Sequence, residues 1–212
     1  MQMKAVSFTP AATRQWCRLS ADIRKRIDAK LTIYATNGSG NVKRLKGAGG
    51  CRLRIADWRV IFIEDARSIT VVAVGNRREI YDSEETVMNV RFKMTDEGEV
   101  AILPRKDYEA LAAKAREADE DAGTARLIVR ARREIAAGMP LIPKEVVDRI
   151  AAGENALRVL REWRGKTQLY ISHKTSMGQG YISDLESGRR KGTTAALKKI
   201  AGVLKIPLDL IA

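Results

Sequence analysis

Cationic side chains dominate the residues that could carry out chemistry in the first part of this chain. Residues 1–87 hold 16 Lys and Arg against 9 Asp and Glu, and they contain no histidine. If this part cleaved RNA, fixed cations would stabilise the charge that develops on the attacked phosphate. A two-histidine mechanism is excluded, and arginine stays protonated up to about pH 12, so it cannot serve as the base. Lys43, Lys46 and Tyr81 remain as candidates for proton transfer, because a lysine crowded by other cations loses its proton more readily.

The net charge of the whole chain points to a polyanionic partner. The 212 residues carry a formal net charge of +13, and the pI is near 10.0. The surplus is +7 over residues 1–87, 0 over 88–153 and +6 over 154–212, so two basic blocks flank a neutral one. Nucleic acid is favoured over a membrane, because no basic amphipathic helix stands out and no run approaches the roughly 18 apolar residues of a membrane span.

The small numbers of cysteine and histidine argue against a disulfide-stabilised protein and against a metal-binding protein. Cys17 and Cys51 are too few for a disulfide framework and favour a reducing cytoplasm. His173 is the single histidine and no CxxC motif is present, so we expect no metal site and no cofactor. Residues 1–8 lack the pattern of a signal peptide, and we therefore expect a cytoplasmic protein.

The order of the predicted elements is that of an α+β protein. A strand at residues 4–8 precedes two helices, which begin at Pro10 and after the cap residue Ser20. In the run Arg52–Ile55, arginines alternate with aliphatic residues, which places Arg52 and Arg54 on one strand face. A hairpin over 90–103 and a long helix from Pro104 with an apolar seam of mostly alanine follow, and then an all-helical end. The four predicted short strands after the first helices are 42–45, 52–55, 59–64 and 68–74.

The C-terminal helical pieces resemble the Xre/Cro-type helix-turn-helix family over about residues 155–211. The resemblance rests on Thr167–Ser172 and Met177–Arg190, with Ser176 at a turn position where the family usually has glycine. It implies that Gln179 and Gly180 begin the recognition helix, where a glutamine can pair with an adenine edge, and that the cations after this helix bind phosphates. The DNA-binding residues it predicts are Gln168, Gln179, Gly180, Ser183, Arg189, Arg190 and Lys191.

The first 82 residues or so resemble the RelE/ParE superfamily of toxins. The resemblance rests on four stretches, Val42–Gly47, Cys51–Ile55, Asp57–Phe62 and Gly75–Tyr81. The RelE branch cleaves messenger RNA in the ribosome, whereas the ParE branch inhibits DNA gyrase. The resemblance implies two helices packed on a small antiparallel sheet, and it implies a catalytic role for six residues. Of these, Arg52, Arg54, Arg59 and Arg77 would bind phosphate, Lys46 would assist, and Tyr81 would stack on a base or transfer a proton.

Residues 88–152 resemble the N-terminal part of antitoxins that pair with such toxins, with Val100–Leu111 as the best piece. The resemblance implies that the hairpin and the long helix pack on the toxin-like fold. We then expect the acidic residues Glu117, Asp119, Glu120 and Asp121 to shield its basic site. A solvated acidic helix face is the alternative. Shielding within one chain and shielding between two swapped chains both remain open.

Together these interpretations predict a toxin domain over 1–87, a toxin-binding segment over 88–153 and a helix-turn-helix domain over 154–212. The predicted function is a fused type II toxin–antitoxin protein. It would bind operator DNA as a homodimer and hold inactive an endoribonuclease that cleaves mRNA on the ribosome. One alternative is a transcriptional regulator with a catalytically dead RelE-like interaction domain. Another is a ParE-like gyrase inhibitor fused to its antitoxin.

Overall fold

The computed structural model describes residues 3–45, 49–77, 80 and 105–212, with side chains in the last range from Glu120 onward. The predicted hairpin over 90–103 and the predicted site residues Lys46 and Tyr81 lie outside the described residues. So do the side chains of Glu117 and Asp119. Within the described part, no helix is long and apolar enough to cross a membrane.

A six-stranded sheet forms the centre of the N-terminal half, in the order β2-β3-β4-β5-β1-β6. The strands β2 to β5 pair in antiparallel fashion, as their short connections require. β1 instead pairs in parallel with β5, and β6 adds to the free edge of β1 in antiparallel fashion. The α+β class is confirmed, while the sheet is mixed rather than antiparallel throughout. The strands are β1 (Ala5–Phe8), β2 (Val42–Leu45), β3 (Gly50–Ile55), β4 (Trp58–Glu64), β5 (Ser68–Asn76) and β6 (Ile142–Pro143).

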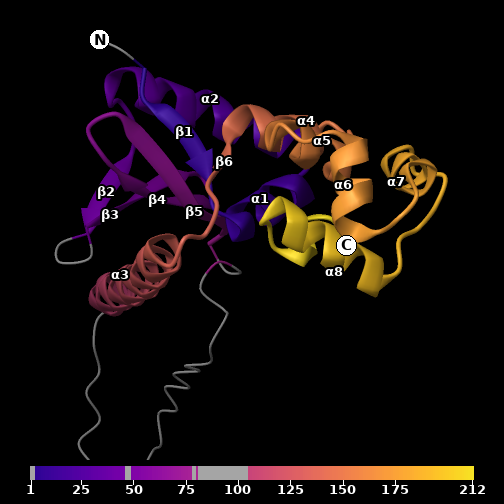
Figure 1. Cartoon of the computed structure of the whole chain (residues 1–212). Helices are drawn as coiled ribbons and strands as arrows, with labels where there is room; N and C mark the ends of the chain where they lie inside the picture. Colours follow the sequence, from indigo (N-terminus) through magenta and orange to yellow (C-terminus); the bar gives the residue numbers. More distant parts are fainter. Residues whose placement is uncertain (1–2, 46–48, 78–79, 81–104) are drawn as a thin grey trace, which may run out of the picture.

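Helices cover both faces of this sheet (Figure 1). α1 (Pro10–Arg18) and α2 (Ala21–Asn37) pack on one face, where Trp16, Ile27 and Leu31 join the main core. Thr9 caps α1 by accepting a hydrogen bond from the backbone of Ala12. α3 (Arg105–Ala136) lies on the other face, over β3, β4 and β5. The predicted toxin-like fold is therefore a sheet enclosed between an N-terminal helix pair and a later helix.

The face of α3 that meets the sheet differs from the predicted alanine seam. Ile128 and Ala131 are buried against β4 and β5, as the seam requires, but Ala122 is exposed. One turn earlier the buried positions are polar, namely Glu120 and Thr124. Hydrophobic periodicity could not reveal these positions, because their burial depends on the cations opposite them in the sheet.

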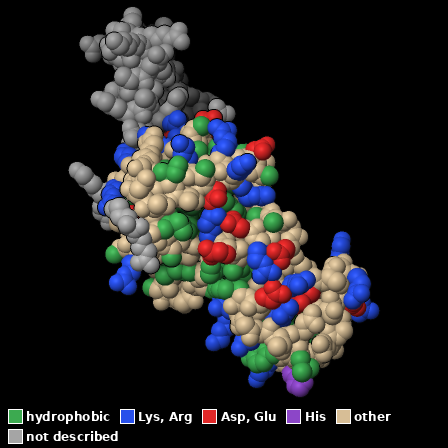
Figure 2. Space-filling model, turned by 90° about the horizontal axis from the view of Figure 1, so that it is seen from above, with side chains coloured by type: hydrophobic (Ala, Val, Ile, Leu, Met, Phe, Trp, Pro, Cys, Tyr) green, Lys and Arg blue, Asp and Glu red, His purple; other side chains and the backbone are tan. Residues whose placement is uncertain are grey.

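The C-terminal half is all-helical and shares a core with the N-terminal half. Buried residues from Phe8 to Leu210 form one continuous cluster. α4 packs on α1 and β1 and then on α5, and Lys144 of α4 bonds to Asp28 of α2 at 2.7 Å. Carboxylates and cations gather beside one another on the face seen in Figure 2. The helices are α4 (Lys144–Ala151), α5 (Ala156–Trp163), α6 (Gln168–Thr175), α7 (Gln179–Glu186) and α8 (Thr194–Leu204), followed by the 3₁₀ turn η1 (Leu208–Leu210).

The fold encloses one carboxylate at the α2 face of the sheet. Glu64 accepts hydrogen bonds from Lys4 Nζ at 2.5 Å, from the Tyr34 hydroxyl at 3.0 Å and from Arg44 Nη2 at 3.0 Å. Burial raises the pKa of Glu64, but the bonds from Lys4 and Tyr34 outweigh burial and hold that pKa below its ordinary value. Burial and the bond to Glu64 together raise the pKa of Tyr34 to about 12.

We expect Tyr34 to ionise near pH 12 in an alkaline titration followed by tyrosinate absorbance. The folded state favours the neutral phenol, so this contribution to stability is complete below pH 10 and is lost as the pH rises towards 12. Tyr34→Phe should remove the ionisation step near pH 12. Tyr170→Phe is the control, because Tyr170 is exposed. An ionisation step near pH 12 that survives Tyr34→Phe would contradict the assignment.

The turn between α6 and α7 contains a strained residue. Ser176 ends α6 in the left-handed conformation with φ of 56°, which costs a residue with a Cβ atom roughly 1–2 kcal/mol. We expect Ser176→Gly to raise the free energy of unfolding by about 1 kcal/mol in a denaturant titration. Ser176→Ala keeps the Cβ atom and should give no such gain. Equal effects of the two substitutions would show that the backbone strain is not the cause.

Candidate functional site

Four of the predicted site arginines converge on one carboxylate of α3. Arg52 and Arg54 share a face of β3, and Arg59 is the cross-strand partner of Arg54 on β4. Arg77 follows β5 and forms an ion pair with Glu120 Oε1. Glu120 Oε2 lies 3.4 Å from Arg52 Nη1, 3.6 Å from Arg59 Nε and 3.8 Å from Arg54 Nη2. Residues from β3, β4 and the end of β5 thus meet at a single point under α3.

A second carboxylate of α3 extends this contact. Asp121 Oδ1 lies 2.9 Å from Arg52 Nη2, and its other oxygen accepts a hydrogen bond from Lys43 Nζ of β2 at 2.6 Å. Arg52 Nη1 also lies 3.4 Å from the hydroxyl of Thr124. We call Lys43, Arg52, Arg54, Arg59 and Arg77 together the cationic cluster. Lys43 belongs to this cluster because it is the cross-strand partner of Arg52 and pairs with Asp121. The next residue, Arg44, lies on the opposite face of the strand and pairs with Glu64.

Burial makes this contact more than a surface ion pair. The Arg52 side chain has no exposed surface, and those of Arg59 and Glu120 are each 7% exposed. Arg77 is 44% exposed and lies at the rim. A charge buried in this way is costly unless it is paired, so Glu120 and the arginines depend on one another. The alternative prediction, that the acidic residues of this helix form a solvated face, is wrong for Glu120, because Glu120 is buried.

Arg59 also has a structural role in the turn between β3 and β4. Its Nη1 donates to the carbonyl oxygens of Ala56 at 2.8 Å and Trp58 at 3.1 Å. Ala56 has a positive φ of 51° in the turn between β3 and β4, so Arg59 ties down a strained turn. Its Nε lies 3.6 Å from Glu120 Oε2. Arg59 therefore both stabilises the turn and belongs to the cationic cluster.

The described members of the cluster can hold an anion better than they can move a proton. Guanidinium groups present fixed donors that match phosphate oxygens, but they do not lose their protons. Lys43 is the one described member of the cluster that could serve as a base. Cys51 belongs to the opposite face of β3, where burial and Glu64 raise the pKa of its thiol. Lys46 and Tyr81, the other candidates, lie outside the described residues.

Close packing at two glycines completes the contact between α3 and the sheet. A Cβ atom built on Gly50 of β3 would lie 1.8 Å from Cδ1 of Ile128, so only glycine lets α3 approach this closely. The neighbouring carbonyl oxygen of Gly49 accepts a hydrogen bond from Arg132 Nη2 at 2.7 Å.

The predicted DNA-binding residues lie on α6, α7 and the turn after α7. Gln179 and Gly180 are exposed in the first turn of α7, and Ser183 is half-buried. Arg189 bonds to Asp184 at 3.0 Å, the guanidinium of Arg190 lies 5.7 Å from the ring centre of Tyr181, and Lys191 is exposed. The structure therefore brings these residues together around one helix and its C-terminal turn.

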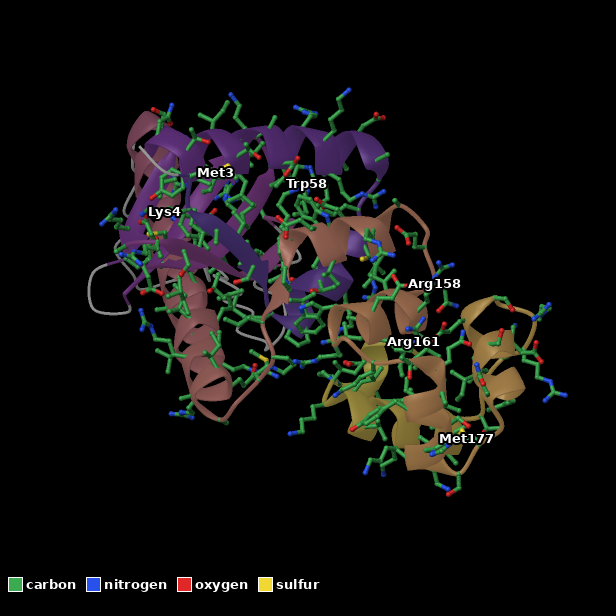
Figure 3. The ribbon with its side chains drawn as sticks, turned by 45° about the horizontal axis from the view of Figure 1, so that its top comes forward. Met3, Lys4, Trp58, Arg158, Arg161 and Met177 are labelled. Atoms are coloured by element: carbon green, nitrogen blue, oxygen red, sulfur yellow. The ribbon has the colours of Figure 1, made fainter. Side chains whose placement is uncertain are left out.

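Gln168 has a partner that sequence analysis missed. Its Nε2 donates to Glu186 Oε2 at 2.9 Å, and the same carboxylate accepts two bonds from Arg161 of α5, at 2.5 and 2.9 Å. Arg161, which is labelled in Figure 3, belongs to α5. Glu186 is buried, and Arg161 also donates to the carbonyl oxygen of Lys166 at 2.8 Å. This network fixes the orientation of the first residue of α6.

Comparisons with known proteins match the two ends of the chain to two different families. Residues 6–81 match the ParE toxin of the type II toxin–antitoxin system parDE, and residues 157–211 match the helix-turn-helix family. No curated protein matches the chain. Two similar solved structures are the RelB–RelE antitoxin–toxin complex from Methanococcus jannaschii (22% identity, TM-score 0.32) and the toxin–antitoxin complex RelBE2 from Mycobacterium tuberculosis (21%, 0.31). The first covers 35% of this chain and 94% of its own, and the second 36% and 100%.

The chain joins a toxin-like domain and a helix-turn-helix domain in one polypeptide. Its N-terminal domain is a RelE/ParE-superfamily toxin domain, which agrees with the sheet and helices described above. Its C-terminal domain is an Xre-type helix-turn-helix DNA-binding domain, formed around α6 and α7. The two family matches leave residues 82–156 between them, and this interval contains α3.

Proposed function

We propose that this protein represses its own operator as a homodimer while α3 holds an RNA-cleaving toxin domain inactive. Residues 1–87 would be the ribosome-dependent mRNA endoribonuclease, residues 88–153 the neutralising segment and residues 154–212 the DNA-binding domain. The observation that carries this proposal is the position of Glu120, which contacts all four arginines assigned to phosphate binding. Neutralisation would occur within one chain, because this contact forms without a second copy.

The neutralisation follows from competition for the same donors. An RNA phosphate would need the guanidinium groups of Arg52, Arg54 and Arg77, because bidentate arginine contacts suit phosphate oxygens. Glu120 and Asp121 occupy this position with their own oxygens, and the body of α3 covers Arg52 completely. RNA could therefore reach the cluster only after α3 moves away.

A second candidate function has two observations in its favour. The family match to the N-terminal domain is to a ParE toxin of the parDE system, and the described part of the cationic cluster is richer in anion-binding groups than in proton-transfer groups. A gyrase inhibitor needs no general base, so this composition would suit it. The same composition of the cationic cluster is also compatible with a third function, a catalytically dead domain that only binds other proteins.

Expression of the full chain carrying Glu120→Arg separates these functions. The full chain is preferable to residues 1–87 alone, because β6 and α4 complete the sheet and core of the toxin domain. Growth arrest with cleaved messenger RNA supports the endoribonuclease, whereas DNA damage without RNA cleavage supports the gyrase inhibitor. Normal growth, with α3 shown to be released, would support the dead domain. Glu120→Arg,Arg77→Ala should restore growth if the cationic cluster is the site.

For the DNA-binding half, we expect Gln179→Ala to relax the preference for one base pair by about 1–3 kcal/mol. Gln179 is exposed at the start of α7, where it can reach a base edge. Lys191→Ala should instead weaken binding to all sequences alike and reduce the salt dependence. Binding titrations with the operator and with single-base variants of it measure both effects. If the two variants behave alike, α7 does not read bases as proposed.

A further inference from the structure

Residues 142–151 complete the toxin-like domain, although neither family match includes them. β6 pairs with the edge of β1, where Ile142 lies opposite Phe8. Both side chains are completely buried in the main core. α4 begins directly after β6 and packs on α1 and β1, and Val147 of α4 has no exposed surface. The sheet edge and the adjoining part of α1 are therefore covered by a segment that comes long after the matched toxin region in the chain.

The same segment also belongs to the helix-turn-helix half. α4 packs on α5, and Leu160 of α5 lies in the same continuous core as Phe8 and Val147. Arg149 of α4 bonds to Glu162 of α5 at 2.8 Å. α4 thus packs on the toxin-like fold on one side and on the DNA-binding helices on the other.

Two ion pairs cross the junction between the halves directly. Lys144 of α4 bonds to Asp28 of α2 at 2.7 Å, and Arg14 of α1 forms an ion pair with Asp209 of η1. Partly exposed pairs of this kind stabilise little by themselves, so the apolar core must carry most of the coupling. Domains that meet through a small polar interface move independently, whereas a continuous apolar core makes them unfold together.

We propose that the toxin-like domain and the helix-turn-helix domain unfold as one cooperative unit, so that DNA bound by α6 and α7 stabilises the sheet that carries the cationic cluster. A ligand that binds only the folded state stabilises everything that unfolds together with its site. Proteolytic loss of the DNA-binding half then unfolds the toxin-like domain instead of setting it free. This coupling depends on the packing of α4 and is the same for every kind of toxin activity.

Native-state hydrogen exchange of the full-length protein tests the coupling. The probe is a DNA duplex selected from a random pool for tight binding to this protein. At a free duplex concentration of about 100 times Kd, the slowest-exchanging amides of β5 and of α8 should both gain about hundredfold protection. Gln179→Ala,Lys191→Ala changes two exposed residues of the DNA-binding half and should reduce both gains together. A gain confined to α5–α8 would overturn the proposal, and so would a gain in β5 that remains after the gain in α8 is lost.

A destabilising substitution tests the same coupling without DNA. Leu204 of α8 is 2% exposed, so Leu204→Ala leaves a cavity in the core of the helix-turn-helix half. In one cooperative unit, the slowest-exchanging amides of β5 lose protection by the same factor as those of α8, at least tenfold. Leu169→Ala is the matched control, because Leu169 is 52% exposed and its truncation should change neither set. If β5 keeps its full protection in Leu204→Ala, the two domains unfold independently and the proposal is wrong.

Discussion

Glu120→Arg is expected to release α3 from the sheet and to expose the cationic cluster. The substitution removes the carboxylate that contacts four arginines and places a further cation among them. Breaking a buried ion pair by removing one partner costs about 3–5 kcal/mol, and the added positive charge makes the closed state worse. Because single domains are stable by only about 5–15 kcal/mol, the docking of α3 should not survive this change.

Limited proteolysis and hydrogen exchange measure that release. The amides of residues 120–136 should lose protection, and trypsin should cut after Arg126 or Arg130 much faster than in the unaltered protein. Glu134→Arg is the matched control, because Glu134 pairs with exposed Arg130 at the surface of the helix. Such surface pairs contribute about 0–1 kcal/mol, so this variant should keep α3 protected. A protected α3 in Glu120→Arg would show that Glu120 does not hold the helix in place.

Gly50→Ala is expected to push α3 away from the sheet by a steric route. The new Cβ atom would lie 1.8 Å from Cδ1 and 2.7 Å from Cγ1 of Ile128, which is far inside van der Waals contact. Ile128 is completely buried, so it has no open space to move into. Overpacking of a buried contact costs about 1–3 kcal/mol or more, and here it acts on the interface that covers the cationic cluster.

A double-mutant cycle isolates this contact. Ile128→Ala alone should cost about 2–5 kcal/mol through lost burial. It removes the side-chain atoms that clash with an alanine at position 50, so Gly50→Ala,Ile128→Ala should be less destabilised than the sum of the single variants. Denaturant unfolding of the four proteins gives the coupling energy. Additive effects would mean that α3 and β3 do not pack as described. Gly178→Ala is the control for adding a methyl group, because nothing lies within 4 Å of that position.

Local sequence signals were sufficient for most of the elements. The four short strands predicted after the first helices correspond to β2, β3, β4 and β5, and β2 matches its predicted bounds at Val42 and Leu45. The helix starts at Pro10 and after Ser20 are confirmed, as is the placement of Gln179 at the start of α7. Caps, turn residues and alternating apolar residues act over a few positions, and a single sequence contains this information.

Long-range partners determined the rest. The sequence could show that Arg52 and Arg54 share a strand face, but not that this face is buried beneath Glu120 and Thr124. The pairing of β6 with β1 and the bond from Gln168 to Glu186 likewise join residues far apart in the chain. By itself, the sequence determined the elements, the two kinds of domain and which cations lie together on a strand. Only the tertiary structure decided that α3 covers these cations, because the burial of a charge depends on partners brought close by folding rather than on its neighbours in sequence.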